Sequence, residues 1–306
     1  MYRVTPVSDM IKERSAVDLQ GLKLFRAVAD AGSLSKAAVH LHYAQSNLST
    51  KMLQLEKELH AKLLYRTSHG VTLTPKGKVL YGYAGDLLSL ADEALRAMSD
   101  DGCDTGSISI GSMESTAAAF LPRFLADFHQ AHPQISVRVD TGTTRASIDK
   151  LLDHRVDGAF VAGPLHHSDL ESIFIRTEHL VLISDPADSR ADIQEIISKR
   201  PMLVFPVGCS YRKSFERLFE ETHLLPKQVF EFNTLNAILS SLNAGLGAAL
   251  LPSSVIDQIP YDFSVHEVPR EIADVQTIFI YHKNSYLSGA MRSFIGALKT
   301  VNEAGK

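Results

Sequence analysis

The stretch from Gly32 to Gly77 constrains what this chain can fold into more than any other part of its sequence. It holds two short helical patterns joined by a tight turn, and it ends in a hairpin-like tail. The apolar residues before it, from Leu22 to Ala29, fall on one face of a helix that would stop at the glycine. Ser33 is a natural N-cap for the helix that follows. This order of elements predicts a helix-turn-helix with a wing.

Apolar residues at helical spacing define the expected core of this unit. The second helix carries two alanines, which let neighbouring helices approach closely, and a turn at His42 and Tyr43 separates it from the third. The expected core positions of these two helices are Leu34, Ala37, Ala38, Leu41, Leu48, Met52, Leu55 and Leu59.

The opposite face of the third helix is polar and mostly neutral, with Gln45, Ser46, Asn47, Ser49 and Thr50. Short amide and hydroxyl side chains can donate to or accept from base edges without a large desolvation cost. An ordinary solvated helix face would more often carry Glu and Lys, and on this helix a run of charges appears only at residues 56–58. The pattern therefore favours a recognition helix that enters the major groove of DNA.

An extended set of positions makes this stretch resemble the N-terminal domain of LysR-type transcriptional regulators. The matching residues are Phe25, Ala27, Val28, Gly32, Ser33, Leu34, Ala37, Ala38, Leu41, Gln45, Ser49, Leu55, Glu56, Leu59, Leu63, Arg66, Leu73, Thr74, Pro75 and Gly77. Three residues depart from the usual pattern: Ser46, Thr50 and His60 stand where proline, arginine and glycine are common.

The resemblance implies which side chains contact double-stranded promoter DNA. Side chains of the third helix would contact bases and nearby phosphates, and Arg66 on the wing would contact the DNA backbone or the minor groove. The residues expected to bind DNA are Ser33, Gln45, Ser46, Asn47, Ser49, Lys51, Arg66, His69 and Lys76.

Charge is distributed unevenly along the 306 residues. The net charge is only −4, yet nine cations face three anions between Gln20 and Tyr83, which gives this segment +6 and leaves −10 for the rest. A basic N-terminal segment joined to an acidic remainder predicts that the N-terminal part binds DNA, with an affinity that depends strongly on salt concentration.

Several features bear on location and bound metals. The content of 45% hydrophobic residues is that of an ordinary soluble protein. No apolar run is long enough to span a membrane and no signal peptide is evident, so we expect a cytoplasmic protein. Cys103 and Cys209 are expected to be reduced thiols, and no Cys/His spacing suggests a metal site.

Thr74 and Pro75 mark the start of a long helix that would run to about Met98. Small and apolar residues form a heptad seam along this helix, at Leu80, Ala84, Leu87, Ala91, Ala94 and Met98. The seam could pack on its own domain, but between two domains its regularity favours pairing with a second copy of the chain. The resemblance implies a dimer through this helix, a tetramer through the C-terminal domains, and RNA polymerase as a further candidate partner.

Strands and helices alternate after a polar, glycine-containing segment at 100–106. The first set is expected as strands at 107–111, 135–140 and 158–162 with helices at 117–131 and 146–154. The second set is expected as strands at 179–184, 201–205, 228–232, 248–251 and 275–281 with helices at 211–223, 235–244 and 286–301. This βαβαβ order predicts α/β subdomains with parallel strands.

The C-terminal part thereby resembles the periplasmic-binding-protein-like effector domain of LysR-type regulators. The fold class is an α+β chain in two parts: a winged helix-turn-helix, a linker helix, and an α/β effector domain of two subdomains. The expected divisions are a flexible arm at 1–16, the DNA-binding domain at 17–74, the linker helix at 75–99, a hinge at 100–106, and the effector domain at 107–306. Within that domain, subdomain I is expected at 107–178 plus 279–306 and subdomain II at 179–278.

Ligands in open parallel sheets bind beyond the carboxyl ends of strands, where loops and helix N-termini present free N–H groups. Five such strand ends are rich in hydroxyls, glycine and proline, and simple helix capping is the alternative for each residue. Thr234, beside the last of them, shares this ambiguity. The residues expected to bind a small-molecule effector are Ser112, Glu114, Ser115, Thr116, Thr141, Thr143, Thr144, Gly163, Pro164, Pro206, Gly208, Ser210 and Asn233.

Glu114 is unusual for such a site, because its carboxylate would repel an anionic effector. It could instead bind an amine or a hydroxyl, or point outward. No nucleophile elbow, dinucleotide fingerprint or P-loop is present, so we expect neither an enzyme nor a cofactor other than the effector. We therefore expect a promoter-binding regulator controlled by a small molecule. The alternative is a cytosolic solute-binding or small-molecule-sensing protein without direct promoter control.

Overall fold

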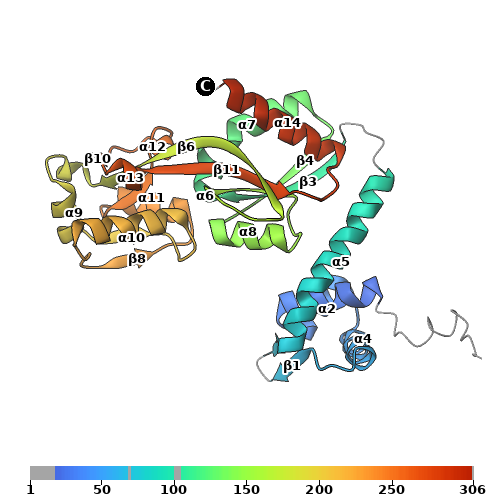
Figure 1. The fold of residues 1–306 in the computed structure, drawn as a ribbon. Helices are drawn as coiled ribbons and strands as arrows, with labels where there is room; N and C mark the ends of the chain where they lie inside the picture. Colours follow the sequence, from blue (N-terminus) through green and yellow to red (C-terminus); the bar gives the residue numbers. More distant parts are fainter. Residues whose placement is uncertain (1–17, 68–69, 100–104, 305–306) are drawn as a thin grey trace, which may run out of the picture. The chain divides into compact units, whose positions relative to one another are not determined.

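The computed structural model describes residues 18–67, 70–99 and 105–304 (Figure 1). The chain divides into two compact units, residues 1–99 and 100–306. The expected arm at 1–16, residues 100–104 of the expected hinge, Cys103 and His69 lie outside the described residues.

The first unit opens with three helices whose ends follow from local chemistry. They are α2 (Leu19–Ala31), α3 (Leu34–Leu41) and α4 (Gln45–Glu58). Gly32 ends α2 in the left-handed conformation, with φ 59°, and Ser33 Oγ caps α3 by accepting from the backbone N of Lys36 at 3.4 Å. The expected caps are confirmed. Leu48, Met52 and Leu55 of α4 are buried in the core of the unit.

An antiparallel hairpin, β1 (Leu64–Thr67) and β2 (Gly70–Leu73), forms the wing. The long helix α5 (Pro75–Ser99) follows, as the Thr74-Pro75 signal predicts. Thr74 Oγ1 accepts from the backbone N of Gly77 at 2.9 Å and donates to the carbonyl of Lys62 at 2.7 Å, so one side chain fixes both helix and wing. A Cβ at Gly77 would lie 2.1 Å from the carbonyl oxygen of Leu63, so only glycine permits this approach.

The second unit begins with three parallel strands, β3 (Gly106–Met113), β4 (Ile135–Gly142) and β5 (Gly158–Gly163). Helices α7 (Leu121–Ala131) and α14 (Gly289–Ala304) lie together over one face of this sheet (Figure 1). Helix α8 (Thr144–Leu152) packs on β5. An aromatic cluster that includes Phe124, Phe160 and Phe294 fills the space under α7 and α14.

The single helix expected at 117–131 is wrong. The chain instead forms α6 (Glu114–Ala119) and α7, separated at Phe120. Pro122 lies in the first turn of α7, where its missing N–H costs nothing, and it disfavours continuous helix through the residues before it. The earlier start of α6 places Glu114 at the first position of a helix.

Two long strands run side by side between the subdomains (Figure 1). They are β6 (Leu170–Ser184) and β11 (Asp274–His282), and both are antiparallel to their neighbours. The first part of β6 pairs with β11, while its last residues pair with β9 and β10. The expected subdomain boundary at residues 278/279 falls inside β11, which is continuous.

The second subdomain is built around the end of β6. Its elements are η1 (Pro186–Asp188), α9 (Ile193–Lys199), β7 (Met202–Val204), α10 (Ser210–Thr222), β8 (Val229–Glu231), α11 (Leu235–Asn243), β9 (Ala249–Pro252), α12 (Ser253–Ile256), β10 (Ser264–Glu267) and α13 (Arg270–Ala273). Strands β7 and β8 are parallel, as expected, and a single bridge joins β7 to the residue before β9.

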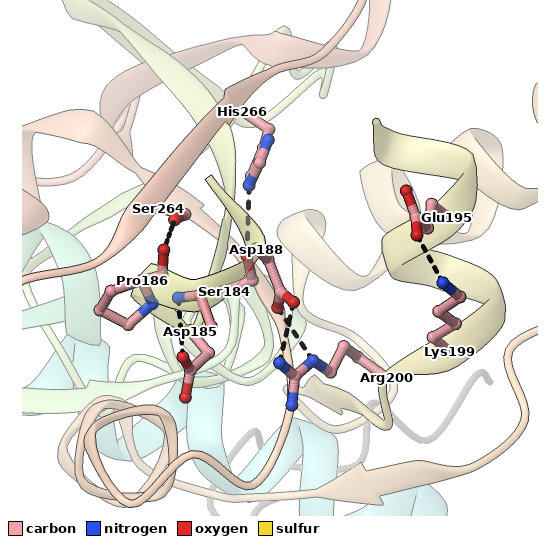
Figure 2. Close-up of polar contacts among 10 residues, drawn as sticks. Ser184, Asp185, Pro186, Asp188, Glu195, Lys199, Arg200, Ser264 and His266 are labelled. Atoms are coloured by element: carbon pink, nitrogen blue, oxygen red, sulfur yellow. Dashed lines mark hydrogen bonds and ion pairs between the residues drawn. The ribbon is translucent and has the colours of Figure 1, made fainter. Parts of the chain in front are cut away.

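Polar contacts fix one end of this subdomain (Figure 2). Two guanidinium nitrogens of Arg200, just after α9, meet the two carboxylate oxygens of Asp188 in η1 at 2.8 and 2.9 Å. Ser264 Oγ on β10 donates to the carbonyl of Pro186 at 3.2 Å. The charge-assisted, two-pronged contact joins η1 to the end of α9, and the Ser264 bond joins η1 to β10.

Candidate DNA-binding surface and effector cavity

The polar face of α4 is accessible in the structure. Gln45, Ser46, Asn47 and Lys51 are exposed, and Ser49 is half-buried. Ala44 precedes the helix and makes no side-chain cap, so the first N–H groups of α4 are left for another partner. A helix N-terminus with free N–H groups is a ready site for a phosphate.

Arg66 of β1 is bound to this helix rather than projecting from the wing alone. Its Nη1 donates to Ser49 Oγ at 3.0 Å, and its Nη2 lies 3.8 Å from Oε2 of Glu56. The other oxygen of Glu56 accepts from the backbone N of Leu63 at 2.7 Å and of Leu64 at 3.1 Å. Glu56 and Arg66 thus link the end of α4 to the first strand of the wing.

The remaining expected DNA contacts lie in different places. Ser33 is half-buried as the cap of α3, and Lys76 is exposed in the first turn of α5. Exposed lysines accompany the polar face of α4 on the surface of this unit: Lys23, Lys36, Lys51, Lys57, Lys62, Lys76 and Lys78. Their charge is what a phosphate-binding surface requires.

Helix α5 differs from the expected seam. Ala84 is fully buried and Leu80 packs against the core of its own unit, so the first part of the seam is intramolecular. The exposed apolar side chains include two seam positions, Leu87 and Met98, and further positions beside the seam. We call the whole set the α5 stripe: Val79, Tyr83, Leu87, Leu90, Leu95 and Met98. Contact of α5 with α2 explains the difference, because the hydroxyl of Tyr81 donates to Asp30 and Arg26 stacks over the Tyr81 ring.

A cavity of about 180 Å³ lies between the two subdomains of the second unit. We call it the effector cavity. Residues at the ends of β3, β4 and β7 and at the starts of α6, α8 and α10 form its wall, with Asn233 before α11. The lining residues are Met113, Glu114, Ser115, Gly142, Thr143, Thr144, Phe205, Pro206, Cys209, Tyr211 and Asn233.

Three side-chain hydrogen bonds join the subdomains around this cavity. Ser115 Oγ and the hydroxyl of Tyr211 lie 2.8 Å apart, and both residues are buried. Ser210 Oγ donates to Thr144 Oγ1 at 3.1 Å. Burial raises the pKa of the Tyr211 hydroxyl, which therefore stays protonated at neutral pH.

The third bond places Glu114. Its Oε2 accepts from the backbone N of Leu235, the first residue of α11, so the carboxylate spans from subdomain I to a helix N-terminus of subdomain II. A carboxylate at that position is stabilised by the helix dipole. Glu114 therefore lines the cavity and does not point outward.

The structure brings some of the expected effector residues together and disperses others. Glu114, Ser115, Thr143, Thr144, Pro206 and Asn233 line the effector cavity. Thr141, Gly163 and Pro164 are not among the lining residues, and Ser112 and Thr116 are buried in the subdomain itself. Gly208 and Ser210 contact α8 from the other subdomain, through the bonds of Gly208 O to Arg145 N and of Ser210 to Thr144.

Sequence reasoning missed the apolar part of the wall. Met113 ends β3 and Phe205 directly follows β7, and those positions are the signal that could have identified them, whereas Tyr211 lies in the first turn of α10. Cys209 also lines the cavity, and burial raises the pKa of its thiol, which opposes formation of a reactive thiolate. Among the described residues, no group of three or more His, Cys, Asp or Glu side chains is arranged to hold a metal ion. None of the described helices has the length and apolar character needed to cross a bilayer.

Comparison with known proteins matches both units of the chain to one family. A family model described as "Bacterial regulatory helix-turn-helix protein, lysR family" matches residues 19–78, and one described as "LysR substrate binding domain" matches residues 102–303. The HTH-type transcriptional regulator CzcR of Bacillus thuringiensis is 37% identical over 295 residues, which cover 96% of each chain.

Solved structures share the fold. A full-length OxyR variant from Pseudomonas aeruginosa superposes with a TM-score of 0.66 at 20% identity, over 94% of each chain. Full-length CbnR in complex with its target DNA gives a TM-score of 0.54 at 23% identity, over 93% of this chain and 99% of CbnR.

The fold and the two sites define a DNA-binding transcriptional regulator that carries an effector-binding domain. The chain belongs to the LysR family of transcriptional regulators. The matched family and the curated relatives are transcriptional regulators and not enzymes.

Proposed function

We propose that a small molecule bound in the effector cavity controls how this regulator binds promoter DNA. The observation that carries the proposal is the wall of the cavity, which both subdomains supply and which hydrogen bonds cross at Ser115–Tyr211 and Ser210–Thr144. A ligand in such a place contacts both subdomains at once. Its affinity therefore differs between conformations in which the two subdomains stand at different angles. Such a difference in affinity is what a ligand needs to shift a conformational equilibrium.

The DNA contacts would come from α4 and the wing. The exposed amide and hydroxyl groups of Gln45, Ser46 and Asn47 are suited to base edges, and the surrounding lysines are suited to phosphates. Arg66 and Ser49 would act as one unit, because they are hydrogen bonded to each other.

Two copies of the chain would pair through the α5 stripe. Exposed Val79, Tyr83 and Leu90 repeat at helical spacing along a helix that has its other face on its own core. A pair of recognition helices reads two half-sites, which multiplies specificity. Two such dimers would then join through their effector domains, and RNA polymerase is the partner on which a promoter-bound regulator would act.

A gel-shift assay with the full chain tests the proposal. DNA from upstream of its own gene should be retarded, and the retardation should weaken steeply with salt. Small metabolites that raise the melting temperature of the chain are then added, because a true effector stabilises the state that it binds. Such a compound should change the affinity or the length of the protected DNA. If compounds bind in the cavity and DNA binding does not change, the chain senses a small molecule without promoter control, and the proposal fails.

A further inference from the structure

Glu114 carries the one formal charge among the described residues that line the effector cavity. No Lys, Arg or His of the described part of the chain lines it. We propose that the cavity selects a small molecule with an ammonium or hydroxyl head and rejects the same molecule with a carboxylate head, and that Glu114 makes this selection. The inference rests on the proposed function, since it concerns the effector of that same site.

The contacts of Glu114 leave half of its carboxylate for a ligand. Oε2 accepts from the backbone N of Leu235, and Oε1 has no partner among the described residues. An ionised carboxylate can only accept hydrogen bonds. The ligand must therefore bring a donor to this oxygen, and ammonium and hydroxyl groups are donors.

The positive end of α11 is already used by the protein itself. Glu114 takes the first N–H of α11, so that helix cannot offer this group to a ligand carboxylate. Thr143 does the same at α8, where its Oγ1 accepts from the backbone N of Ala146 at 3.2 Å. With these two N–H groups occupied and no cationic side chain among the described residues of the wall, a second carboxylate beside Glu114 would lack a cationic partner.

The size and chemistry of the rest of the wall fit such a ligand. The cavity has a volume of only about 180 Å³, and Glu114 shares its wall with the apolar residues. Met113, Phe205 and Pro206 offer apolar surface for its body. Asn233 can donate or accept, so it tolerates further hydroxyls and adds no charge.

The experiment uses matched ligands that share one body and differ in the head group. The probes are 2-phenylethylamine, 2-phenylethanol and phenylacetate, with butylamine, butanol and butyrate as a smaller set. Isothermal titration calorimetry of the full wild-type chain should give binding of the amine or the alcohol, with the matched carboxylate at least about tenfold weaker.

Two variants assign the preference to Glu114. Glu114→Gln keeps an oxygen that can accept from the backbone N of Leu235 and removes the charge. The carboxylate ligand should therefore bind about tenfold more tightly to this variant, and the amine ligand should bind more weakly. Asp149→Asn is the matched control, because it removes one negative charge from an exposed position of α8 that is paired with Arg145. It should leave the head-group preference unchanged.

Three results overturn the inference. They are equal binding of carboxylate and amine to the wild-type chain, an unchanged preference in Glu114→Gln, and no binding of any amine or alcohol. The wild-type comparison needs no variant, so it stands even if Glu114→Gln unfolds. A ligand that shows the expected preference but leaves promoter binding unaltered contradicts the proposed function instead. Carboxylates that bind in the cavity and alter promoter binding contradict only the selection by Glu114.

Discussion

Arg66 on the wing donates from Nη1 to Oγ of Ser49 on the recognition helix, over 3.0 Å. Both residues are expected to contact DNA, so this bond makes the phosphate-binding and base-reading parts of the surface depend on each other. Glu56 strengthens the link from the other side, with Oε2 at 3.8 Å from Nη2 of Arg66. The position of Ser49 towards a base edge therefore depends on a wing residue.

Arg66→Ala should weaken binding to all DNA sequences and lower the slope of log K against log salt by about 0.9, since one phosphate contact is lost. Arg66→Lys keeps the charge but cannot reproduce the fork to Ser49 and Glu56. It should therefore retain non-specific affinity and lose preference for the cognate site. Fluorescence anisotropy at several salt concentrations measures both quantities. If Arg66→Lys kept the wild-type sequence specificity, the bond between Arg66 and Ser49 would not be needed to position Ser49 for base reading.

Gln45→Ala should relax sequence preference at one base pair by about 1–3 kcal/mol, because a side-chain amide can bond a base edge in two places. Lys57→Ala, at the charged end of the same helix, should instead weaken binding to all DNA sequences by the same factor. Selection of binding sites from a random DNA pool distinguishes the two effects. An unchanged consensus in Gln45→Ala would remove this residue from the reading surface.

The helix-turn-helix was predictable because its signals are local. Gly32 in the left-handed conformation, the cap at Ser33 and the start at Thr74-Pro75 each depend on neighbouring residues only. The short elements of the second subdomain were not predicted, since four-residue pieces such as β10 and α13 are set by packing on β6. The break at Phe120 did have a local signal, Pro122, which the expectation of a single helix overlooked.

The effector cavity shows where sequence reasoning stops. Hydroxyls after strand ends identified Ser115, Thr143 and Thr144, because helix starts and ligand loops share that position. The side chain of Tyr211 could not be placed in this way, since an apolar residue in a helix indicates core and not which cavity the core borders. The bond between Glu114 and Leu235 joins residues 121 positions apart, and no local pattern encodes it.

The face of α5 used for pairing can be tested at Leu90, which is 62% exposed in the α5 stripe. Leu90→Glu should shift the chain towards the monomer and weaken DNA binding, because a charge would be buried between two helices and one half-site would be lost. Asp92→Lys is the control, since helical spacing places residue 92 on the other side of α5. Sedimentation velocity measures the mass. A wild-type oligomer in Leu90→Glu would exclude this stripe as the interface.

Tyr211→Phe and Ser115→Ala should each destabilise the effector domain by about 1–3 kcal/mol, because each leaves the other hydroxyl buried without its partner. The double variant should lose less unfolding free energy than the sum of the two single losses, since both hydroxyl groups are then gone. Urea unfolding of the four proteins gives this coupling. Additive losses would mean that the bond contributes nothing. Basal DNA affinity should stay unchanged, because the other unit carries the recognition helix.

His179 on β6 lies between two carboxylates, with Asp274 at 2.9 Å from Nδ1 and Glu267 at 2.7 Å from Nε2. The hydrogen bonds to Asp274 and Glu267 raise the pKa of His179 above its ordinary 6.5. A raised pKa in the folded chain means that the charged imidazole stabilises the fold fully below pH 6.5. That stabilisation is lost as the pH rises through the raised value.

The stability difference between the wild-type chain and His179→Gln should therefore shrink as the pH is raised from about 6 to about 9. Urea unfolding across this range measures it, and the effect should be small because the site is partly exposed to solvent. Glu267→Gln and Asp274→Asn each remove one carboxylate and should each flatten the dependence in part. A stability difference that is constant over the range would show that the two carboxylates do not raise the pKa of His179.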